Sequence, residues 1–580
     1  MTVQSQTAQT KSKQKATKPP VAAKKDHKTD IHGIKRNDPY HWLRDENWQK
    51  VMVDPDLLNG EIREYLEAEN QYFKDAFDNN NTELQKEIYD EIRARMKEDE
   101  TGVPTPDGPF AYYSKMETGK QYPLMVRTAR VGGDEAILLD CNKEAADGYF
   151  GFGGAFHDPE HRFLAWSCDR AGSEYYTLKI RDIESGQDIN DEIEKTSGAI
   201  VWANDSKSIY YTALDQNHRP YRIMEHRIGD KQSDDKIIYE ESDAGFFVGM
   251  AKTLSSRFIL ISSHDHQTSE IHLIDTMNDG EMSIVSPRQT GHEYSVDERN
   301  GELFILTNCD NAKDFKIVRV DAKNPEQANW RDEIAHNSGT LIVNCFVIKN
   351  HLIRLERFEG LPRIIIRNLL NGEEKAIAFE EEAYALGVWP GYEFDTTSIR
   401  LNYSSPTTPS QTYDYDIATG ERVLRKQQEI PSGHNSEDYV TSRIFAPSGD
   451  QQVPITLLHH KDTALDGSAP CLLYGYGSYG VSIPAGFSIT NLSLVDRGFI
   501  YAIAHVRGGM EKGYQWYENG RRDLKTNTFD DFIAVAQHLG KQKIAAKDKI
   551  VAHGGSAGGM LMGAIANMQP DMFAGIIAQV

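Results

Sequence analysis

The period of apolar and polar positions changes along the chain, and each change predicts a different kind of structure. Residues 62–77 and 84–96 carry apolar side chains at helical spacing, which predicts two helices that face a core. From about residue 105 the pattern becomes short apolar strands separated by polar turn residues. From about residue 431 apolar strands alternate with helical stretches, an order typical of a parallel sheet with helices on both faces.

The strand-rich region repeats at a nearly constant interval. Strands of one kind begin at residues 110, 163, 209, 258, 303, 352 and 399, at intervals of 45 to 53 residues. A period just under fifty with several strands per unit is typical of β-propeller blades. We therefore predict an all-β seven-bladed propeller over residues 81–430. An array of β-sandwiches is the alternative, and the regular spacing disfavours it.

Candidate chemistry lies in the last region, at Gly554-Gly555-Ser556-Ala557-Gly558. This stretch follows an apolar strand and precedes an apolar helix, and G-x-S-x-G at such a turn is typical of the nucleophile elbow of α/β-hydrolases. The flanking glycines allow strand and helix to pack closely. The pattern predicts Ser556 as a nucleophile and directs the Ala557 amide towards a developing oxyanion. An ordinary glycine-rich turn is the alternative.

These patterns divide the chain into four predicted parts. Residues 1–28 carry lysines among small polar residues with no acid before Asp26, which predicts a disordered tail. Residues 29–80 are predicted as an N-terminal helical segment that joins the hydrolase domain, and residues 81–430 as the propeller. Residues 431–580 are predicted as an α/β-hydrolase domain with a doubly wound, mostly parallel sheet.

Composition excludes several classes of function. The 64 basic and 87 acidic residues give a net charge of -23, which argues against nucleic-acid binding and mildly favours basic ligands. No apolar stretch is long enough to span a membrane, and the N-terminus has no signal-peptide pattern. The scattered cysteines have no metal-like spacing and favour a reducing, cytoplasmic compartment; they are Cys141, Cys168, Cys309, Cys345 and Cys471. We predict no metal and no organic cofactor.

Several motifs together resemble the prolyl oligopeptidase family of serine peptidases. They are residues 554–559, Tyr474-Gly475-Tyr476-Gly477, Val506-Arg507-Gly508-Gly509 and the preceding repeat. Residues 38–45, 65–70 and 242–249 further resemble the oligopeptidase B branch, which cleaves peptides after Lys or Arg. The resemblance covers about residue 30 to the last residue.

The resemblance implies roles for three residues. Ser556 matches the family nucleophile, Tyr476 matches the tyrosine whose hydroxyl assists the oxyanion hole, and the Ala557 amide is the second donor. The implied reaction is hydrolysis of short peptides by acyl transfer, with the propeller restricting access to the site. For Tyr476 the alternative is an aromatic side chain that only packs in its loop.

The chain departs from the family pattern in two respects. It ends at Val580, 24 residues after Ser556, so the family Asp and His are expected beyond Val580 and the domain is expected to lack its C-terminal part. His505 and His553 are weaker candidates for a substitute base, with structural roles favoured. Residues 481–486 lack the acids that can read basic substrates in the oligopeptidase B branch, which leaves Glu511 as a weak contributor or a solvated loop acid.

The sequence leaves rival functions open. One is another hydrolase of the same fold, either a prolyl-specific oligopeptidase or an esterase. The other is a catalytically dead propeller protein that binds peptides.

Overall fold

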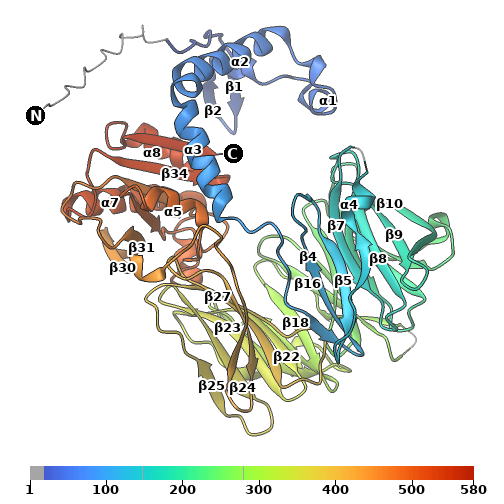
Figure 1. The fold of residues 1–580 in the computed structure, drawn as a ribbon. Helices are drawn as coiled ribbons and strands as arrows, with labels where there is room; N and C mark the ends of the chain where they lie inside the picture. The colour runs from blue at the N-terminus through green and yellow to red at the C-terminus, as the bar shows by residue number, and fades with distance from the viewer. Residues whose placement is uncertain (1–17, 147, 279, 580) are drawn as a thin grey trace, which may run out of the picture. The chain divides into compact units, whose positions relative to one another are not determined.

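The computed structural model describes residues 18–146, 148–278 and 280–579, and the chain separates into two compact units, residues 1–94 and 95–580 (Figure 1). In the first unit an antiparallel hairpin precedes three helices. Both helices predicted from the apolar pattern are present, as α2 and α3, but Ile62 is their only buried apolar side chain among the described residues, so the prediction that they face a core is wrong. The elements are β1 (Lys28–Ile31), β2 (Ile34–Asn37), α1 (Trp48–Val53), α2 (Gly60–Phe73) and α3 (Asn79–Arg95), the last of which ends at the boundary.

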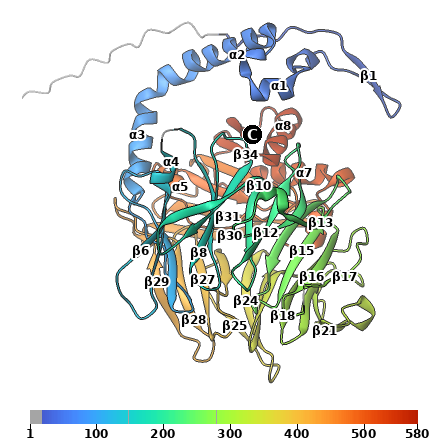
Figure 2. The ribbon, with the colours of Figure 1, turned by 90° about the vertical axis from the view of Figure 1, so that its right-hand side faces the viewer.

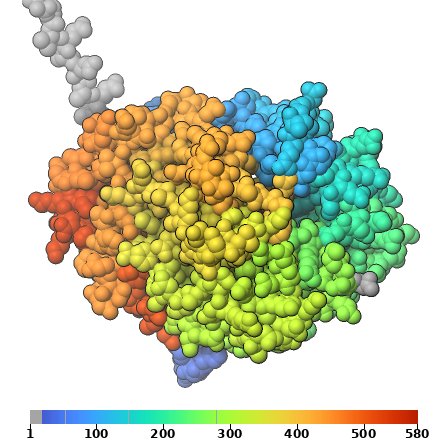
Figure 3. All heavy atoms as spheres, turned by 90° about the horizontal axis from the view of Figure 1, so that it is seen from below, coloured from blue at the N-terminus to red at the C-terminus, as the bar shows by residue number. Residues whose placement is uncertain are grey.

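The second unit contains a ring of antiparallel sheets and an α/β domain. Five of the sheets have four strands each, paired in sequence order, as β-propeller blades do. In Figure 3 their colours follow one another around one face, from light blue through green and yellow to orange. The strands are β3 (Thr105–Asp107), β4 (Phe110–Lys115), β5 (Leu124–Ala129) and β6 (Ala136–Asp140); β14 (Phe247–Lys252), β15 (Phe258–His264), β16 (Ser269–Asp275) and β17 (Met282–Ser286); β18 (Tyr294–Arg299), β19 (Glu302–Thr307), β20 (Lys316–Asp321) and β21 (Arg331–Ile334); β22 (Thr340–Ile348), β23 (His351–Phe358), β24 (Leu361–Asn368) and β25 (Glu374–Ile377); β26 (Ala385–Trp389), β27 (Ser398–Ser404), β28 (Gln411–Asp416) and β29 (Arg422–Gln427).

The prediction of seven blades is wrong. The repeat units beginning at residues 163 and 209 form one seven-stranded sheet, because β10 pairs with β9 through its first half and with β11 through its second half. Strand β10 continues through Thr196-Ser197-Gly198, a run of turn residues, and Gly198, with φ +84°, accommodates the irregularity in its register. The strands are β7 (Gly151–His157), β8 (Phe163–Asp169), β9 (Tyr176–Asp182), β10 (Gln187–Trp202), β11 (Ser208–Leu214), β12 (Pro220–Arg227) and β13 (Lys236–Glu240); the short helix α4 (Cys141–Ala145) precedes them.

Among the described residues, the first and last sheets of the ring share no strand. Contacts between side chains join them instead. Arg400 on β27 donates to the Thr105 hydroxyl at 2.7 Å and to the Val103 carbonyl at 3.0 Å. Arg130 makes a forked contact with the Glu393 carboxylate. Figure 2 shows sheets of this ring side by side, with β24, β27 and β28 among the labelled strands.

The α/β domain has a six-stranded sheet in the order β30-β31-β33-β32-β34-β35. The pairs among β33, β32, β34 and β35 are parallel, and β30 and β31 add an antiparallel edge. Phe532, Leu473 and Leu561 are fully buried between sheet and helices. The elements are β30 (Tyr439–Ser448), β31 (Gln451–His460), β32 (Cys471–Gly475), β33 (Ile500–Ala504), β34 (Ile550–Gly555), β35 (Gly575–Gln579), α5 (Ile489–Val495), α6 (Tyr514–Glu518), α7 (Thr526–Lys541) and α8 (Ala557–Met568).

Two further properties bear on the predictions from composition. All five cysteines have free thiols. None of the described helices has both the length and the apolar character that crossing a bilayer requires. The domain boundaries predicted from the sequence stay predictions, and residues 1–17 of the predicted tail lie outside the described residues.

Candidate functional site

Ser556 lies at the turn between β34 and α8, with φ +52° and ψ −122°. A non-glycine residue in the left-handed region carries backbone strain, and such strain concentrates where the surrounding structure holds a residue for function. The Ser556 amide donates to the Gln579 carbonyl at 2.6 Å. Its side chain is exposed. The turn therefore projects a serine hydroxyl out of the sheet, as a nucleophile elbow does.

Glycines make this sharp turn possible. A Cβ on Gly554 would lie 2.5 Å from the Gly558 carbonyl oxygen, and a Cβ on Gly558 would lie 2.9 Å from the Gly475 carbonyl oxygen. Both contacts are with backbone atoms, which cannot move aside as the end of a flexible side chain can. Strand β34, the start of α8 and the end of β32 therefore pack closer together than side chains would allow.

Tyr476 follows β32 directly and lies beside the turn. Its ring carbon Cδ2 is 3.5 Å from the position that a Cβ on Gly558 would occupy, and its side chain is half-buried. Ala557 is the first residue of α8, so its amide is among the unpaired N–H groups at the helix start. The fold thus brings together the three predicted site residues from two parallel strands that are adjacent in the sheet, β32 and β34. Their roles stay predictions.

The loop that carries Tyr476 is held by residues that the sequence did not single out. The Lys525 ammonium donates to the Gly477 carbonyl and, at 2.9 Å, to the Ser478 hydroxyl. Burial lowers the pKa of Lys525 to about 8. Gly508, with φ +100°, packs so closely that a Cβ there would lie 1.9 Å from the Gly477 oxygen. A lysine at the start of α7 gave no sequence signal, because its partners, a backbone carbonyl and a serine hydroxyl, lie almost fifty residues earlier.

A buried ion pair fixes the neighbouring Arg507-Gly508-Gly509 segment. Arg507 Nε lies 2.8 Å and Arg507 Nη2 2.6 Å from the two carboxylate oxygens of Asp531 on α7. Asp531 also accepts from the Arg507 amide at 3.0 Å and is completely buried. Such a forked, charge-assisted contact has a defined geometry. The motif around Arg507 was visible in the sequence, but its partner Asp531 was not.

The histidines considered as substitute bases have other partners. His505 Nε2 lies 2.9 Å from the Thr456 hydroxyl, and His553 Nε2 lies 3.3 Å from the Gln579 side-chain oxygen. In the described parts of the chain neither shares a hydrogen bond with Ser556. The prediction that the base and its acid follow Val580 stays a prediction.

Glu511 is not a solvated loop acid, because only 3% of it is exposed. Its Oε1 accepts from the Ile483 amide at 3.1 Å and lies 3.5 Å from His505 Nδ1. The carboxylate therefore lies inside the protein, next to a histidine.

The propeller contacts this part of the α/β domain directly. The His266 ring, between β15 and β16, stacks on Tyr479 with ring centroids 5.8 Å apart. The Tyr514 amide donates to Asp314 at 2.7 Å, and the Tyr514 hydroxyl donates to Glu293 at 2.6 Å. Propeller residues thus contact both the loop that carries Tyr476 and helix α6.

One group of described side chains has the composition of a metal site. Potential ligand atoms of Asp107, His157 and His161 all lie within 4.8 Å of one another. Asp107 is already 2.7 Å from His157 Nε2, and the Tyr112 hydroxyl is 2.7 Å from His161 Nδ1. The Tyr112 and His157 rings also stack at 3.7 Å. These contacts form a hydrogen-bonded aromatic cluster.

Comparison with known families agrees with the fold and with the geometry of the turn. The family described as "Prolyl oligopeptidase, N-terminal beta-propeller domain" matches residues 19–428, and "Prolyl oligopeptidase family" matches residues 485–580. The chain belongs to the prolyl oligopeptidase family. The resemblance inferred from the motifs is thereby confirmed, and the relatives place the chain near oligopeptidase B.

Individual relatives cover almost the whole chain. Dipeptidyl aminopeptidase BI of Pseudoxanthomonas mexicana is 36% identical over 97% of this chain and 79% of its own length. Protease 2 of Moraxella lacunata is 31% identical, over 97% and 80% respectively. The solved structure of oligopeptidase B from Leishmania major superimposes with a TM-score of 0.88 at 31% identity, covering 96% of this chain and 81% of that one. This chain is thus a relative of serine peptidases.

Proposed function

We propose that the protein is a serine oligopeptidase that hydrolyses short peptides, with cleavage after Lys or Arg. The observation that carries the proposal is the strained left-handed Ser556, held by glycines 554 and 558 and flanked by Tyr476. The family assignment supports a peptidase reaction. The preference for basic residues is supported by the oligopeptidase B relatives and by the net charge of -23.

The proposed reaction is acyl transfer. The Ser556 oxygen attacks the peptide carbonyl while a general base takes its proton. The Tyr476 hydroxyl and the Ala557 amide donate hydrogen bonds to the oxyanion, and such preorganised donors stabilise the tetrahedral intermediate. The amine leaves with a proton, and water then hydrolyses the acyl-enzyme. The propeller limits access, so that short peptides are the substrates.

A second candidate activity is the release of dipeptides from free N-termini. The observation that favours it is the 36% identity to a protein named dipeptidyl aminopeptidase BI. The two activities differ in whether the substrate needs a free amino group two residues before the cleaved bond.

The test compares fluorogenic peptides with Arg, Lys or Pro before the cleaved bond, each with a free or a blocked N-terminus, and a simple ester. Faster cleavage after Arg and Lys than after Pro is expected, together with labelling of Ser556 by a fluorophosphonate, read as a mass increase. Ser556→Ala should abolish both signals, whereas Ser436→Ala, at an exposed serine of the same domain, should keep them.

Other outcomes would assign other functions. Preference for Pro indicates the prolyl-specific alternative, and hydrolysis of the ester alone indicates an esterase. Strict dependence on a free N-terminus indicates the dipeptidyl activity. Neither labelling nor hydrolysis of any substrate would reject an enzymatic role for Ser556.

A further inference from the structure

A cavity of about 420 Å³ lies between the propeller and the α/β domain. Its propeller wall comes from the β23–β24 turn and from β26, β27 and β28, and its other wall from β30, β31, residues 482–485 and the segment after β33. Ser556, Tyr476 and Ala557 are not among the described residues that line it. Its volume falls in the range of pockets for small molecules.

Buried polar atoms without partners concentrate around this cavity. In the described parts of the chain, Arg443 Nη2, Ser482 Oγ, His505 Nδ1 and Glu511 Oε2 are inaccessible and have no hydrogen-bond partner. His505 is 7% exposed and Glu511 is 3% exposed. Folded proteins leave few buried polar atoms unpaired. Four such atoms around one cavity indicate that something with polar groups occupies it.

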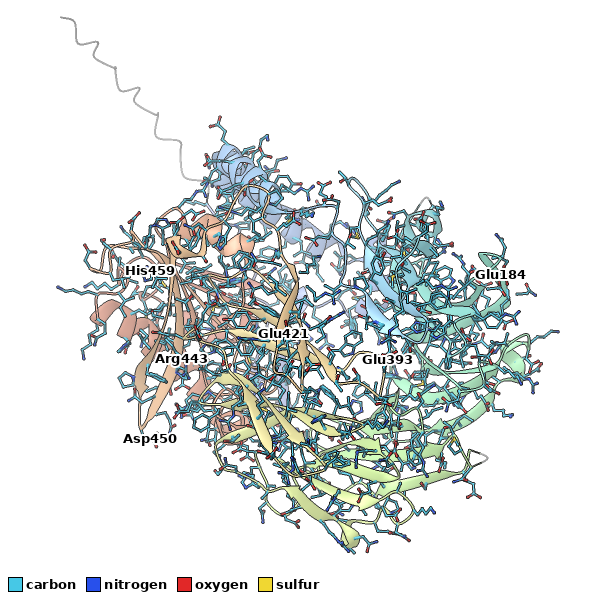
Figure 4. All side chains as sticks on the ribbon, turned by 60° about the horizontal axis from the view of Figure 1, so that its bottom comes forward. Glu184, Glu393, Glu421, Arg443, Asp450 and His459 are labelled. Atoms are coloured by element: carbon cyan, nitrogen blue, oxygen red, sulfur yellow. The ribbon has the colours of Figure 1, made fainter. Side chains whose placement is uncertain are left out.

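Two guanidinium groups line the cavity without a counter-ion in contact. Neither Arg357 nor Arg443 (labelled in Figure 4) makes a side-chain hydrogen bond or ion pair with any described residue. Burial lowers the pKa of both, and the negative charges of Glu511 near Arg357 and Glu359 near Arg443 offset this only in part. By contrast, Arg354, which lies on β23 as Arg357 does, pairs with Glu356 at 2.6 Å and with Glu374 at 2.8 Å.

This arrangement is unfavourable unless a ligand completes it. Removing a charge from water is costly when nothing pairs with it. A guanidinium is suited to bind a carboxylate through two parallel hydrogen bonds. The same cavity also contains Glu511, whose Oε2 lacks a donor. The unpaired groups therefore present both signs of charge, with cations in excess.

We propose that this cavity binds a zwitterionic amino acid or short peptide. Arg357 and Arg443 bind its free carboxylate, and Glu511 accepts from its ammonium group. The apolar side chain packs against Leu361, Leu386 and Pro484, which also line the cavity. A zwitterion meets both signs of charge, whereas a phosphate dianion would be repelled by Glu511. Because the ligand contacts both domains, its binding also strengthens their association.

The inference does not require the proposed peptidase activity, although that activity would produce such molecules. Binding is therefore tested directly, by calorimetry on the full chain carrying Ser556→Ala, so that no peptide is consumed. The probes are the dipeptide Ala-Leu, the same dipeptide with a C-terminal amide, and inorganic phosphate. We expect one Ala-Leu per chain and at least tenfold weaker binding of the amide.

Variants locate the binding site. Arg357→Gln and Arg443→Gln are each expected to weaken Ala-Leu binding at least tenfold, and Arg443→Lys to weaken it less. Arg227→Gln is the matched control, because Arg227 is exposed on β12, and it should leave the affinity unchanged. Since the lost charge is partly buried and makes no ion pair with a described residue, the ligand-free melting temperature of either Gln variant should stay the same or rise.

Several results would overturn the inference. They are no binding of Ala-Leu, equal binding of the amide, binding of phosphate in place of the dipeptide, or an unchanged affinity in both Gln variants. If Arg443→Gln does not fold, Arg357→Gln and Arg443→Lys decide the outcome. A peptidase without this binding, or this binding without peptidase activity, would separate the two proposals.

Discussion

At the scale of single residues, the geometry of the site depends on glycines, which have no side chain. Ser556 adopts its left-handed conformation because Gly554 and Gly558 allow strand β34 and helix α8 to meet with backbone contacts. Tyr476 then packs beside the same turn. Adding a single methyl group at one of these glycines should therefore disturb the site more than removing a larger side chain elsewhere.

Gly554→Ala should lower the free energy of unfolding by about 2–3 kcal/mol, because its Cβ would lie 2.5 Å from a backbone oxygen. Hydrolysis should be lost with the geometry of the turn. Gly563→Ala is the control, since Gly563 lies inside α8 with open space around it, and it should stabilise by up to about 1 kcal/mol. Denaturant unfolding and peptide hydrolysis measure both. Equal behaviour of the two variants would contradict the proposed constraint.

Tyr476→Phe should reduce kcat about 100-fold with little change in KM, because the hydroxyl is proposed to donate only to the oxyanion. The melting temperature should not change. Tyr479→Phe is the control, because Tyr479 is 63% exposed and stacks through its ring on His266. If steady-state kinetics gave similar values for Tyr476→Phe and the unaltered protein, Tyr476 would be a packed loop aromatic.

At the scale of elements, helix α7 positions both glycine-rich segments. Asp531 fixes the segment around Arg507, and Lys525 binds the loop that carries Tyr476. Thr528, on the same helix, donates to the Arg507 carbonyl at 2.7 Å. One helix thus holds the loop that carries Tyr476 and the segment around Arg507, both far from it in sequence.

Asp531→Asn should destabilise the protein by about 3 kcal/mol, because it leaves the buried Arg507 guanidinium without its counter-charge. Hydrolysis should fall in parallel as the Arg507 segment shifts. The neighbouring Asp530→Asn, at an exposed position, should change stability by less than about 0.5 kcal/mol. Urea unfolding distinguishes the two variants. If Asp531→Asn left the free energy of unfolding unchanged, hydrogen bonds alone would hold the segment.

Lys525, at the start of α7, makes the stability of the protein depend on pH. Its pKa falls from the ordinary 10.5 to about 8 in the folded protein, so the unfolded chain holds this proton to higher pH. Stability should therefore rise as the pH increases from about 8 to 10.5, once the folded protein has released the proton. Thermal melts across this range should show a smaller rise for Lys525→Met than for Lys549→Met, an exposed control. Parallel curves for the two variants would refute the assignment.

At the scale of the second unit, the important contacts are those between the propeller and the α/β domain. The Tyr514 hydroxyl joins α6 to Glu293 of the propeller, and burial raises the pKa of that carboxyl. The cavity lined by Arg357 and Arg443 lies between the same two domains. Selection of short peptides, as proposed, requires that these contacts persist during turnover.

Tyr514→Phe should increase the cleavage of long peptides relative to short ones several-fold, because Glu293 loses its partner across the domains. Tyr517→Phe is the control, since its hydroxyl contacts Arg521 within the α/β domain. Mass spectrometry of a short and a long peptide with the same cleavage site gives the ratio. If the ratio did not change, this contact would have no part in size selection.

The sequence by itself determined the local elements and the position of the turn at Ser556. Apolar periods and the G-x-S-x-G spacing depend on neighbours within a few residues, and they identified the helices, the strand repeat and Ser556. Only the tertiary structure decided how distant segments combine. The continuous pairing of β10 merged two repeat units into one sheet, because strand pairing depends on partners that a period does not reveal. Asp531, Lys525 and the two unpaired arginines acquire their importance in the same way, from their position beside residues far along the chain.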